Sequence, residues 1–223
     1  MTARTAWLCD FDGTISPSDI GASLVRRFAP EGAERRRELF ERWKREEIGS
    51  RELARAECED VRASEEEALA FVRTFALDPG FAGFARGALA RGEEVLVLSD
   101  GWDFYIREHL MRAGLDRLPF FANVARFTGG RMIPEFPWSG GCGRCGNCKG
   151  AHAAEWRARG YEVRVVGDGY SDRCAAREAD VVFARGNLLE WCRGEGREVT
   201  PFEDFAALAA VAAETAGPEE RAS

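Results

Sequence analysis

The sequence has no apolar run long enough to cross a membrane, and acidic residues at positions 10 and 12 come before the apolar core of a signal peptide could form. It has two histidines, and only two of its 31 basic residues are lysines. The formal net charge of −7 gives no general attraction to nucleic acid or to an anionic membrane. We therefore expect a cytoplasmic protein that has neither as a partner.

Cysteine is present, but its pattern is not that of a disulfide framework. Seven cysteines are spread over 223 residues, an odd number, without an export signal. This favours reduced thiols over disulfides. With 45% apolar and 31% charged residues and no internal repeats, the chain is long enough for one globular core and a smaller accessory domain.

Short apolar runs alternate with helical patterns over much of the chain. The runs cover residues 5–9, 94–98, 162–166 and 180–184, and helical patterns between them cover 102–113 and 149–159. Alternation of this kind is typical of a parallel sheet with helices on both faces. We predict an α/β fold with a Rossmann-like core, formed by residues 1–17 and 92–214.

Three segments depart from this alternation. Residues 18–91 have amphipathic helical patterns in succession, which predicts a helical cap inserted after the first strand. In segment 120–137, two apolar runs flank Thr128-Gly129-Gly130, a pattern that predicts a small β-hairpin flap. The tail, residues 215–223, is predicted to be disordered.

Within the cap, side chains can be assigned from the helical pattern. Phe40 and Trp43 are predicted to lie in the core of the cap. Ser50 and Ser64 stand where N-caps belong, and the arginines of this segment are predicted to form a solvated face.

Four carboxylates follow the ends of two predicted strands. Asp10 and Asp12 lie in "WLCDFDGTIS", and Asp168 and Asp172 lie in "VVGDGYSD". Since parallel strands end at the same edge of a sheet, these side chains should meet there. Hard oxygen ligands without a histidine cluster favour Mg²⁺ over zinc.

A hydroxyl group and an ammonium group accompany the carboxylates. Ser99 ends the second predicted strand in "VLSDG", followed by Asp100 and Gly101, and Lys149 begins a predicted helix. A hydroxyl donor, an ammonium and a helix N-terminus are suited to binding phosphate.

Three cysteines precede that lysine in "CGRCGNCKG". Cys142, Cys145 and Cys148 could bind zinc, form a disulfide or redox switch, or belong to a flexible loop of reduced thiols. A closed zinc site needs a fourth ligand, and the sequence does not choose among His152, Cys174 and Cys192. The two histidines, His109 and His152, are otherwise predicted to be solvent-facing or capped side chains.

The ordered set of "DFDGT" at 10–14, Ser99, Lys149 and "GDGYSD" at 167–172 resembles the haloacid dehalogenase (HAD) superfamily of phosphohydrolases. The helical insert after the first motif is similar to the cap of its phosphoserine-phosphatase-like branch. Further stretches resemble the group that contains the methionine-salvage 2-hydroxy-3-keto-5-methylthiopentenyl-1-phosphate phosphatase: "SDGWDFYI" at 99–106, "FFAN" at 120–123, "CGNCK" ending at 149, "VFARG" at 182–186 and "TPFEDF" at 200–205.

The resemblance implies a Mg²⁺-dependent phosphomonoesterase that hydrolyses a small phosphorylated metabolite through an aspartyl-phosphate. Asp10 would be the nucleophile, and Asp12 would protonate the leaving group and then deprotonate water. Mg²⁺ would be held by the Asp10 carboxylate, the Asp12 backbone carbonyl and Asp168, with Asp172 as a further ligand or an anchor.

The phosphoryl oxygens would be bound by Ser99 and Lys149, with Asp100 and Gly101 in the same phosphate-binding set. The substrate stays open among the methionine-salvage phosphate, phosphoserine, pyridoxal phosphate and phosphorylated amino alcohols, and the oligomeric state stays open too. Two other functions are alternatives: a phosphoacceptor signalling domain, and a zinc-organised binding module without catalysis.

Overall fold

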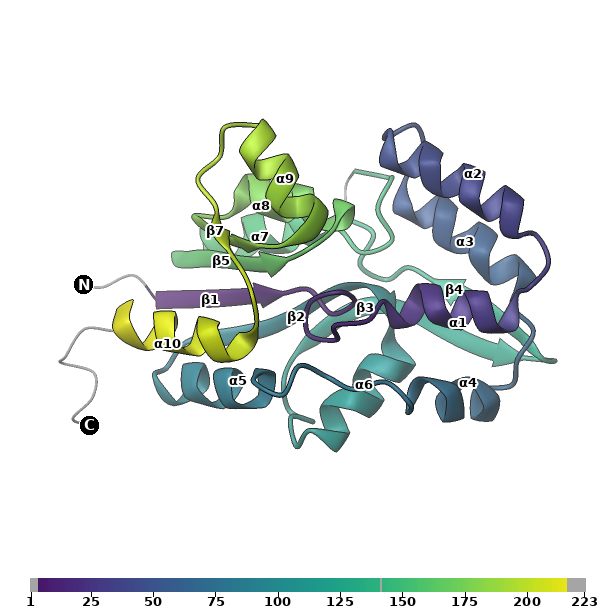
Figure 1. Cartoon of the computed structure of the whole chain (residues 1–223), viewed down its shortest axis with the longest axis horizontal. Coiled ribbons are helices and arrows are strands. Elements are labelled where there is room, and N and C mark those ends of the chain that lie inside the picture. The colour runs from purple at the N-terminus through teal and green to yellow at the C-terminus, as the bar shows by residue number, and fades with distance from the viewer. Residues whose placement is uncertain (1–3, 141, 216–223) are drawn as a thin grey trace.

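The computed structural model of the protein describes residues 4–140 and 142–215 (Figure 1). These residues form a seven-stranded sheet in the order β4-β3-β2-β1-β5-β6-β7. The β3–β4 pair is antiparallel, and the other pairings are parallel. The predicted α/β fold is therefore confirmed. The strands are β1 (Arg4–Cys9), β2 (Glu94–Trp102), β3 (Phe120–Thr128), β4 (Arg131–Glu135), β5 (Tyr161–Gly167), β6 (Val181–Ala184) and β7 (Thr200–Pro201).

Helices cover both faces of the sheet (Figure 1). One layer contains α5 (Phe81–Ala90), α6 (Asp103–Arg112) and α10 (Phe205–Thr215), and the other contains α7 (Lys149–Ala158), α8 (Arg173–Glu178) and α9 (Gly186–Gly194). Side chains of a strand point alternately to its two faces, and the central strand β1 shows this clearly. Trp7 and Cys9 pack in the first layer, whereas Ala6 and Leu8 pack in the second.

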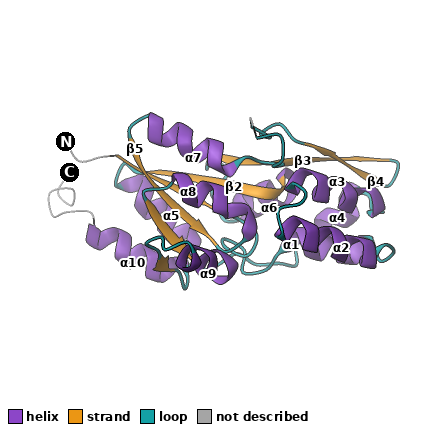
Figure 2. Cartoon of the chain, turned by 90° about the horizontal axis from the view of Figure 1, so that it is seen from above, coloured by secondary structure: helices purple, strands orange, loops and turns teal. Residues whose placement is uncertain are grey.

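The helices α1 (Ile20–Phe28), α2 (Ala33–Lys44), α3 (Ser50–Asp60) and α4 (Glu65–Val72) gather at one end of the sheet, and we call them the cap helices (Figure 2). The β3–β4 hairpin extends to the same end and contacts α3. Its antiparallel register pairs Arg126 with Ile133, which confirms the predicted hairpin.

The predicted cap at residues 18–91 also includes α5, and α5 packs on the sheet. The ring of Phe84 lies 5.0 Å from that of Trp7 on β1, and the ring of Phe81 lies 4.9 Å from that of Phe205 on α10. The apolar face of α5 therefore belongs to the core of the sheet. The division of the chain into domains stays a prediction.

The two predicted helix N-caps have different outcomes. Ser64 forms a capping box with Glu67, as expected for a serine followed three residues later by glutamate. The prediction for Ser50 was wrong, because Gly49 is the N-cap and Ser50 is the first residue of α3. The Ser50 hydroxyl instead accepts a hydrogen bond from the Gly146 N–H (3.0 Å).

Across residues 4–140 and 142–215, no helix is both long and apolar enough to cross a membrane. The predicted tail, 215–223, lies outside the described residues except for its first residue, which ends α10. Each of the seven cysteines is a free thiol, as expected for reduced cysteines.

Candidate active site

The predicted site residues meet where three neighbouring strands end. Asp10 follows β1, Ser99 lies near the end of β2, and Asp168 follows β5. β2 pairs with β1 on one side and β5 pairs with it on the other. Where connections from a central strand run to opposite sides, a crevice forms at the carboxyl ends of the strands, and ligands of open α/β sheets bind there.

Lys149 lies at the bottom of this crevice and joins two carboxylates. Its Nζ donates hydrogen bonds to Asp10 Oδ1 at 2.5 Å and to Asp172 Oδ1 at 2.7 Å, and it lies 3.3 Å from Ser171 Oγ. The side chains of Lys149 and Asp172 are 2% exposed and that of Asp10 is 7% exposed, so these pairs are almost completely removed from water. Although burial lowers the pKa of Lys149, the carboxylates of Asp10 and Asp172 raise it more, so the ammonium stays charged.

One lysine does not balance the charge of this cluster. Carboxylate oxygens of Asp10, Asp168 and Asp172 all lie within 4.8 Å of one another. Burial and the neighbouring Asp172 raise the pKa of Asp10 and that of Asp168, against the lowering effect of Lys149. With all three carboxylates ionised, the cluster and Lys149 would carry two negative charges in excess, which a divalent cation would neutralise. Oxygen ligands of this kind suit Mg²⁺, so the residues present fit the metal.

The loop after β1 brings Asp168 close to the backbone. Asp168 Oδ1 accepts a hydrogen bond from the Thr14 hydroxyl (3.0 Å). Gly13 has φ +82°, and a Cβ there would lie 2.4 Å from Asp168 Oδ2. Only glycine allows this turn and this close approach. Arg185, in the "VFARG" stretch, secures the turn from the other side by donating to the backbone carbonyls of Gly13 and Thr14.

Asp12 is held on both of its carboxylate oxygens. Oδ1 accepts hydrogen bonds from the N–H groups of Ile20 (2.8 Å) and Gly21 (3.4 Å) at the start of α1, and Oδ2 accepts one from the Tyr105 hydroxyl. Burial, aided by the charge of Asp19, nevertheless raises the pKa of Asp12 to about 7. At that pKa a carboxyl group exchanges a proton readily near neutral pH.

Ser99, Asp100 and Gly101 lie in the last part of β2, where its pairing with β3 is irregular. Ser99 Oγ accepts the Gly101 N–H at 2.9 Å, and the Ser99 side chain is buried. A Cβ at Gly101 would lie 2.4 Å from Asp12 Oδ2, so glycine is required here. The Asp100 carboxylate accepts the Asn147 N–H (2.8 Å), and burial raises its pKa.

Asn147 is a residue of the site that the sequence analysis missed. Its side-chain NH₂ donates to the carbonyls of Ser99 (3.0 Å) and Phe121 (2.7 Å), and its Oδ1 pairs with His152 Nε2 (3.0 Å). Asn147 thereby ties the chain just before Cys148 and Lys149 to the last part of β2 and the start of β3. The "CGNCK" stretch contained this signal, since an asparagine can replace backbone partners in this way.

The histidines are not solvent-facing, contrary to that part of the prediction. His152 is 9% exposed and His109 is 3% exposed. Burial lowers the pKa of both, and His109 Nε2 lies 3.0 Å from the Val72 carbonyl. Each histidine is therefore a neutral side chain that pairs with a fixed polar partner.

A cavity of about 270 Å³ opens above the cluster and extends to the cap helices. Asp10, Asp12, Asp168, Ser99 and Gly101 line its floor, and the side chains opposite are mostly apolar, aromatic or acidic. Among these are Phe40 and Trp43, which were wrongly predicted to be cap core. Phe40 is 41% exposed, and both rings line the cavity instead of being enclosed between cap helices.

Comparison with known proteins identifies the family. The model of the "haloacid dehalogenase-like hydrolase" family matches residues 7–177, which is more than half of the chain. The protein belongs to this family, and it is a HAD-type phosphatase, so the resemblance seen in the sequence is confirmed.

Two relatives named 2-hydroxy-3-keto-5-methylthiopentenyl-1-phosphate phosphatase are each 31% identical to the chain. The one from Exiguobacterium sp. aligns over 89% of this chain and 92% of its own, and the one from Geobacillus kaustophilus over 92% and 94%. A solved structure titled "Phospho-Aspartyl Intermediate Analogue of Phosphoserine phosphatase" superimposes with a TM-score of 0.73 at 18% identity, covering 95% of this chain and 99% of its own. At that identity the likeness concerns the fold.

Proposed function

We propose that the protein is a Mg²⁺-dependent phosphomonoesterase that hydrolyses a small phosphorylated metabolite through an aspartyl-phosphate on Asp10. The observation that carries this proposal is the buried cluster of three carboxylates and Lys149 beneath a cavity of about 270 Å³. The excess negative charge suits a divalent cation, and the cavity suits a small ester. The cytoplasmic location stays a prediction.

In the first step, the Asp10 carboxylate attacks phosphorus and the bond from phosphorus to the ester oxygen breaks. Lys149 holds Asp10 Oδ1 at 2.5 Å and thereby fixes the orientation of the nucleophile. Asp12, whose pKa is about 7, transfers its proton to the leaving oxygen. The products of this step are the free alcohol and the phosphorylated Asp10.

In the second step, water attacks phosphorus while Asp12 takes one of its protons. The bond between phosphorus and the Asp10 oxygen breaks, which releases phosphate and restores both carboxyl groups. Asp10, Asp168, Asp172 and the Asp12 backbone carbonyl would hold Mg²⁺, which would supply positive charge to stabilise the phosphoryl oxygens. Ser99 and the backbone from there to Gly101 lie beside the cavity floor and are proposed to bind the same oxygens.

Removal of the metal tests this proposal directly. We expect hydrolysis of p-nitrophenyl phosphate to be lost in EDTA and restored by Mg²⁺. Mg²⁺ at about 100 times its Kd should also stabilise the protein by about 2.7 kcal/mol, a rise of several degrees in Tm, because it relieves the carboxylate repulsion. The rise should disappear in Asp168→Asn. Full activity in EDTA, or an equal Tm rise in this variant, contradicts the proposed metal site.

The hydrogen bond from Tyr105 should tune the pH dependence. Asp12 must be protonated to act as a general acid, so kcat/KM for an alkyl phosphate should fall as pH rises through about 7. The Tyr105 hydroxyl stabilises the charged form of Asp12 and lowers its pKa. Tyr105→Phe should therefore move this alkaline limb to higher pH, by about one pH unit.

The ionisation of the substrate is the same for the wild type and for Tyr105→Phe. The difference between their pH profiles of kcat/KM therefore reports on the protein. An unmoved alkaline limb in Tyr105→Phe, or a limb that moves to lower pH, would show that Asp12 is not the proton donor.

The wall of the cavity favours a substrate without a carboxylate. Its described lining residues include Phe40, Trp43 and Tyr170 and the acidic Glu57, and no arginine or lysine is among them. Burial and the charge of Asp19 raise the pKa of Glu57 to about 7. A substrate carboxylate would be buried beside Glu57 without a cation, which is costly. An apolar tail, such as the methylthio group in the relatives' named substrate, would pack on the rings.

A panel of phosphate esters tests this preference. We expect kcat/KM for phosphoserine to be at least about tenfold below that for a methylthioalkyl phosphate of similar length. Phosphoethanolamine, whose ammonium can pair with Glu57, represents the second candidate class, and Glu57→Gln should lower its kcat/KM alone. Phosphoserine as the best ester of the panel contradicts this inference.

The sequence left a phosphoacceptor signalling domain as an alternative, and membership of the HAD phosphatases disfavours it. Such a domain keeps its phosphoryl group, whereas an acid of pKa about 7 at Asp12 and a cavity for a small ester suit rapid turnover. Repeated turnover of an ester by each active site would identify a phosphatase. Relatives of this chain are named phosphatases.

A further inference from the structure

Three thiols form a group just before Lys149 in the chain, and a fourth lies beside them. We call residues 142–148 the cysteine loop. The sulfur atoms of its three cysteines, Cys142, Cys145 and Cys148, all lie within 4.8 Å of one another. The side chain of Cys174, in the first turn of α8, lies beside that of Cys145. A second segment thus brings a fourth thiol next to this group, although its sulfur atom is not within 4.8 Å of all three.

The distance between the sulfur atoms fits a shared metal ion. Cys142 Sγ and Cys148 Sγ are 4.0 Å apart, which is about twice the length of a disulfide bond. In a tetrahedral zinc site with Zn–S bonds of about 2.3 Å, the sulfur atoms are about 3.8 Å from one another. The observed separation therefore matches an edge of such a tetrahedron.

Backbone donors prepare the first cysteine for a metal. Cys142 Sγ accepts hydrogen bonds from the N–H groups of Arg144 (3.4 Å) and Cys145 (3.5 Å). Donors directed at a sulfur atom stabilise the thiolate, which is the form that binds a metal. These bonds also fix the turn that separates the first two cysteines.

The structure chooses the fourth ligand among the three candidates. His152 Nε2 is paired with Asn147 Oδ1, and its ring packs 4.6 Å from that of Phe121. Cys192 is fully buried in the apolar layer of α7, α8 and α9. Cys174 contacts Cys145 and packs directly on α7, where a Cβ at Gly150 would lie 3.0 Å from the Cys174 Cβ.

We propose that Cys142, Cys145, Cys148 and Cys174 form a structural zinc site with four thiolate ligands. Thiolates at the corners of a tetrahedron are the donor set of closed structural zinc sites. The ion would join the cysteine loop to α8, and these two segments adjoin Lys149 and Asp172, the partners of the buried ion pair. Cys148 directly precedes Lys149, and Cys174 follows Asp172 by two residues.

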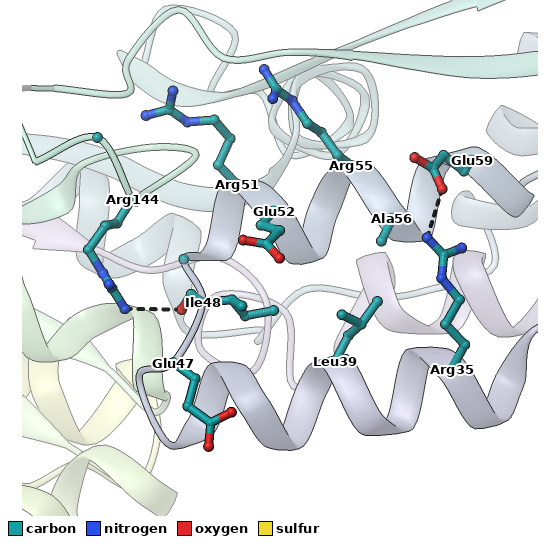
Figure 3. Close-up of a pocket in the computed structure, with 12 residues that line it drawn as sticks. Arg35, Leu39, Glu47, Ile48, Arg51, Glu52, Arg55, Ala56, Glu59 and Arg144 are labelled. Atoms are coloured by element: carbon teal, nitrogen blue, oxygen red, sulfur yellow. Dashed lines mark hydrogen bonds and ion pairs between the residues drawn. The ribbon is translucent and has the colours of Figure 1, made fainter.

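The same loop contacts the cap helices. The Arg144 carbonyl accepts the Arg51 N–H (3.1 Å), and the Arg144 side chain donates to the Ile48 carbonyl at 3.3 Å (Figure 3). A Cβ at Gly49 would lie 2.0 Å from the Arg144 carbonyl oxygen, so the loop and the start of α3 are in close contact. A metal that stiffens the cysteine loop would therefore fix both Lys149 and the start of α3. The effect of this stiffening on catalysis rests on the proposed function, whereas the zinc site itself does not.

Metal analysis of the full chain tests the site without an activity assay. We expect about one equivalent of zinc per chain after purification without added metal, and replacement by Co²⁺ should give the intense visible bands and sulfur-to-cobalt charge transfer of a tetrahedral thiolate site. Less than about a tenth of an equivalent after reconstitution with zinc, iron in its place, or a disulfide among these cysteines would overturn the proposal.

Variants test the ligand set. Cys142→Ser and Cys174→Ser should each weaken zinc binding at least about tenfold in competition with a chromophoric chelator. Cys142 is exposed, so Cys142→Ser should leave the core intact. This variant therefore tests the ligand set even if Cys174→Ser fails to fold. Cys192→Ala is the matched control and should keep full zinc affinity. Wild-type affinity in Cys142→Ser, or a loss in the control equal to that in Cys174→Ser, contradicts the assignment.

Hydrogen exchange tests the link to the active site. Removal of zinc should speed amide exchange at least about tenfold in residues 142–150 and at the start of α3, while β1 stays protected. Unchanged exchange in both segments would overturn the positioning role. None of these measurements uses substrate. The zinc site can therefore be confirmed even if the proposed phosphatase reaction is not, and it can be rejected while the reaction is confirmed.

Discussion

Asp10→Asn is expected to lower kcat for p-nitrophenyl phosphate by at least about 10⁴-fold, the scale seen when a nucleophile is removed. An amide oxygen cannot form the phosphoryl ester, although it still accepts a hydrogen bond from Lys149. The fold should be retained, because burial and Asp172 already disfavour the charged form of Asp10. A steady-state assay with saturating Mg²⁺ measures the loss, and thermal unfolding checks the fold.

Asp180→Asn is the matched control for this variant. Asp180 is a carboxylate at the opposite edge of the sheet, where it accepts the Val163 N–H at 2.9 Å. Its substitution should leave turnover unchanged. Turnover by Asp10→Asn within tenfold of the wild type would remove Asp10 from the role of nucleophile.

Asp12→Asn should separate the two chemical steps. The p-nitrophenolate group leaves without a proton, so phosphorylation of Asp10 should remain fast, whereas its hydrolysis lacks a general base and should slow by about 10²–10⁴-fold. Stopped-flow absorbance should then show a burst of one p-nitrophenolate per active site, followed by slow turnover. An alkyl phosphate needs the proton, so it should show no burst and a comparable loss in the first step.

The pattern across substrates makes this prediction specific. If Asp12 only supports the fold through Ile20 and Tyr105, both esters should lose activity equally and no burst should occur. Such an equal loss would contradict the proton-transfer role.

The sequence was sufficient to predict the floor of the site. Asp10, Ser99 and Asp168 each follow an apolar run, and parallel strands bring their ends to one edge, so a one-dimensional pattern determined which residues meet. The confirmed fold class follows from the same alternation. The roles of these residues stay predictions, because proximity alone does not assign a reaction.

The rest of the cavity could not be predicted, because the sequence does not show how the helices are oriented relative to one another. A helical period shows that Phe40 and Trp43 lie on an apolar face, but it does not show whether that face meets another helix or an open cavity. Tyr105 is the third residue of α6, and its contact with Asp12 depends on how α6 is placed relative to the loop after β1. Helix placement results from tertiary packing, which local propensity does not specify.

The cysteines show the same limit. Their spacing brought together the three sulfur atoms of the cysteine loop, whereas Cys174 lies beside Cys145 because α8 packs against α7. Three candidates for the fourth ligand were equal in the sequence, and two of them are engaged elsewhere in the fold.

The central claim is that Asp10 carries the phosphoryl group. The most direct measurement is rapid acid quench of the Asp12→Asn enzyme during turnover of p-nitrophenyl phosphate, followed by peptide mass spectrometry under acidic conditions. We predict one phosphoryl group, labile to hydroxylamine, on the peptide that contains Asp10 and on that residue. A phosphoryl group on Asp168, Asp172 or Ser99, or an enzyme that turns over without any phosphorylated peptide, would contradict the account.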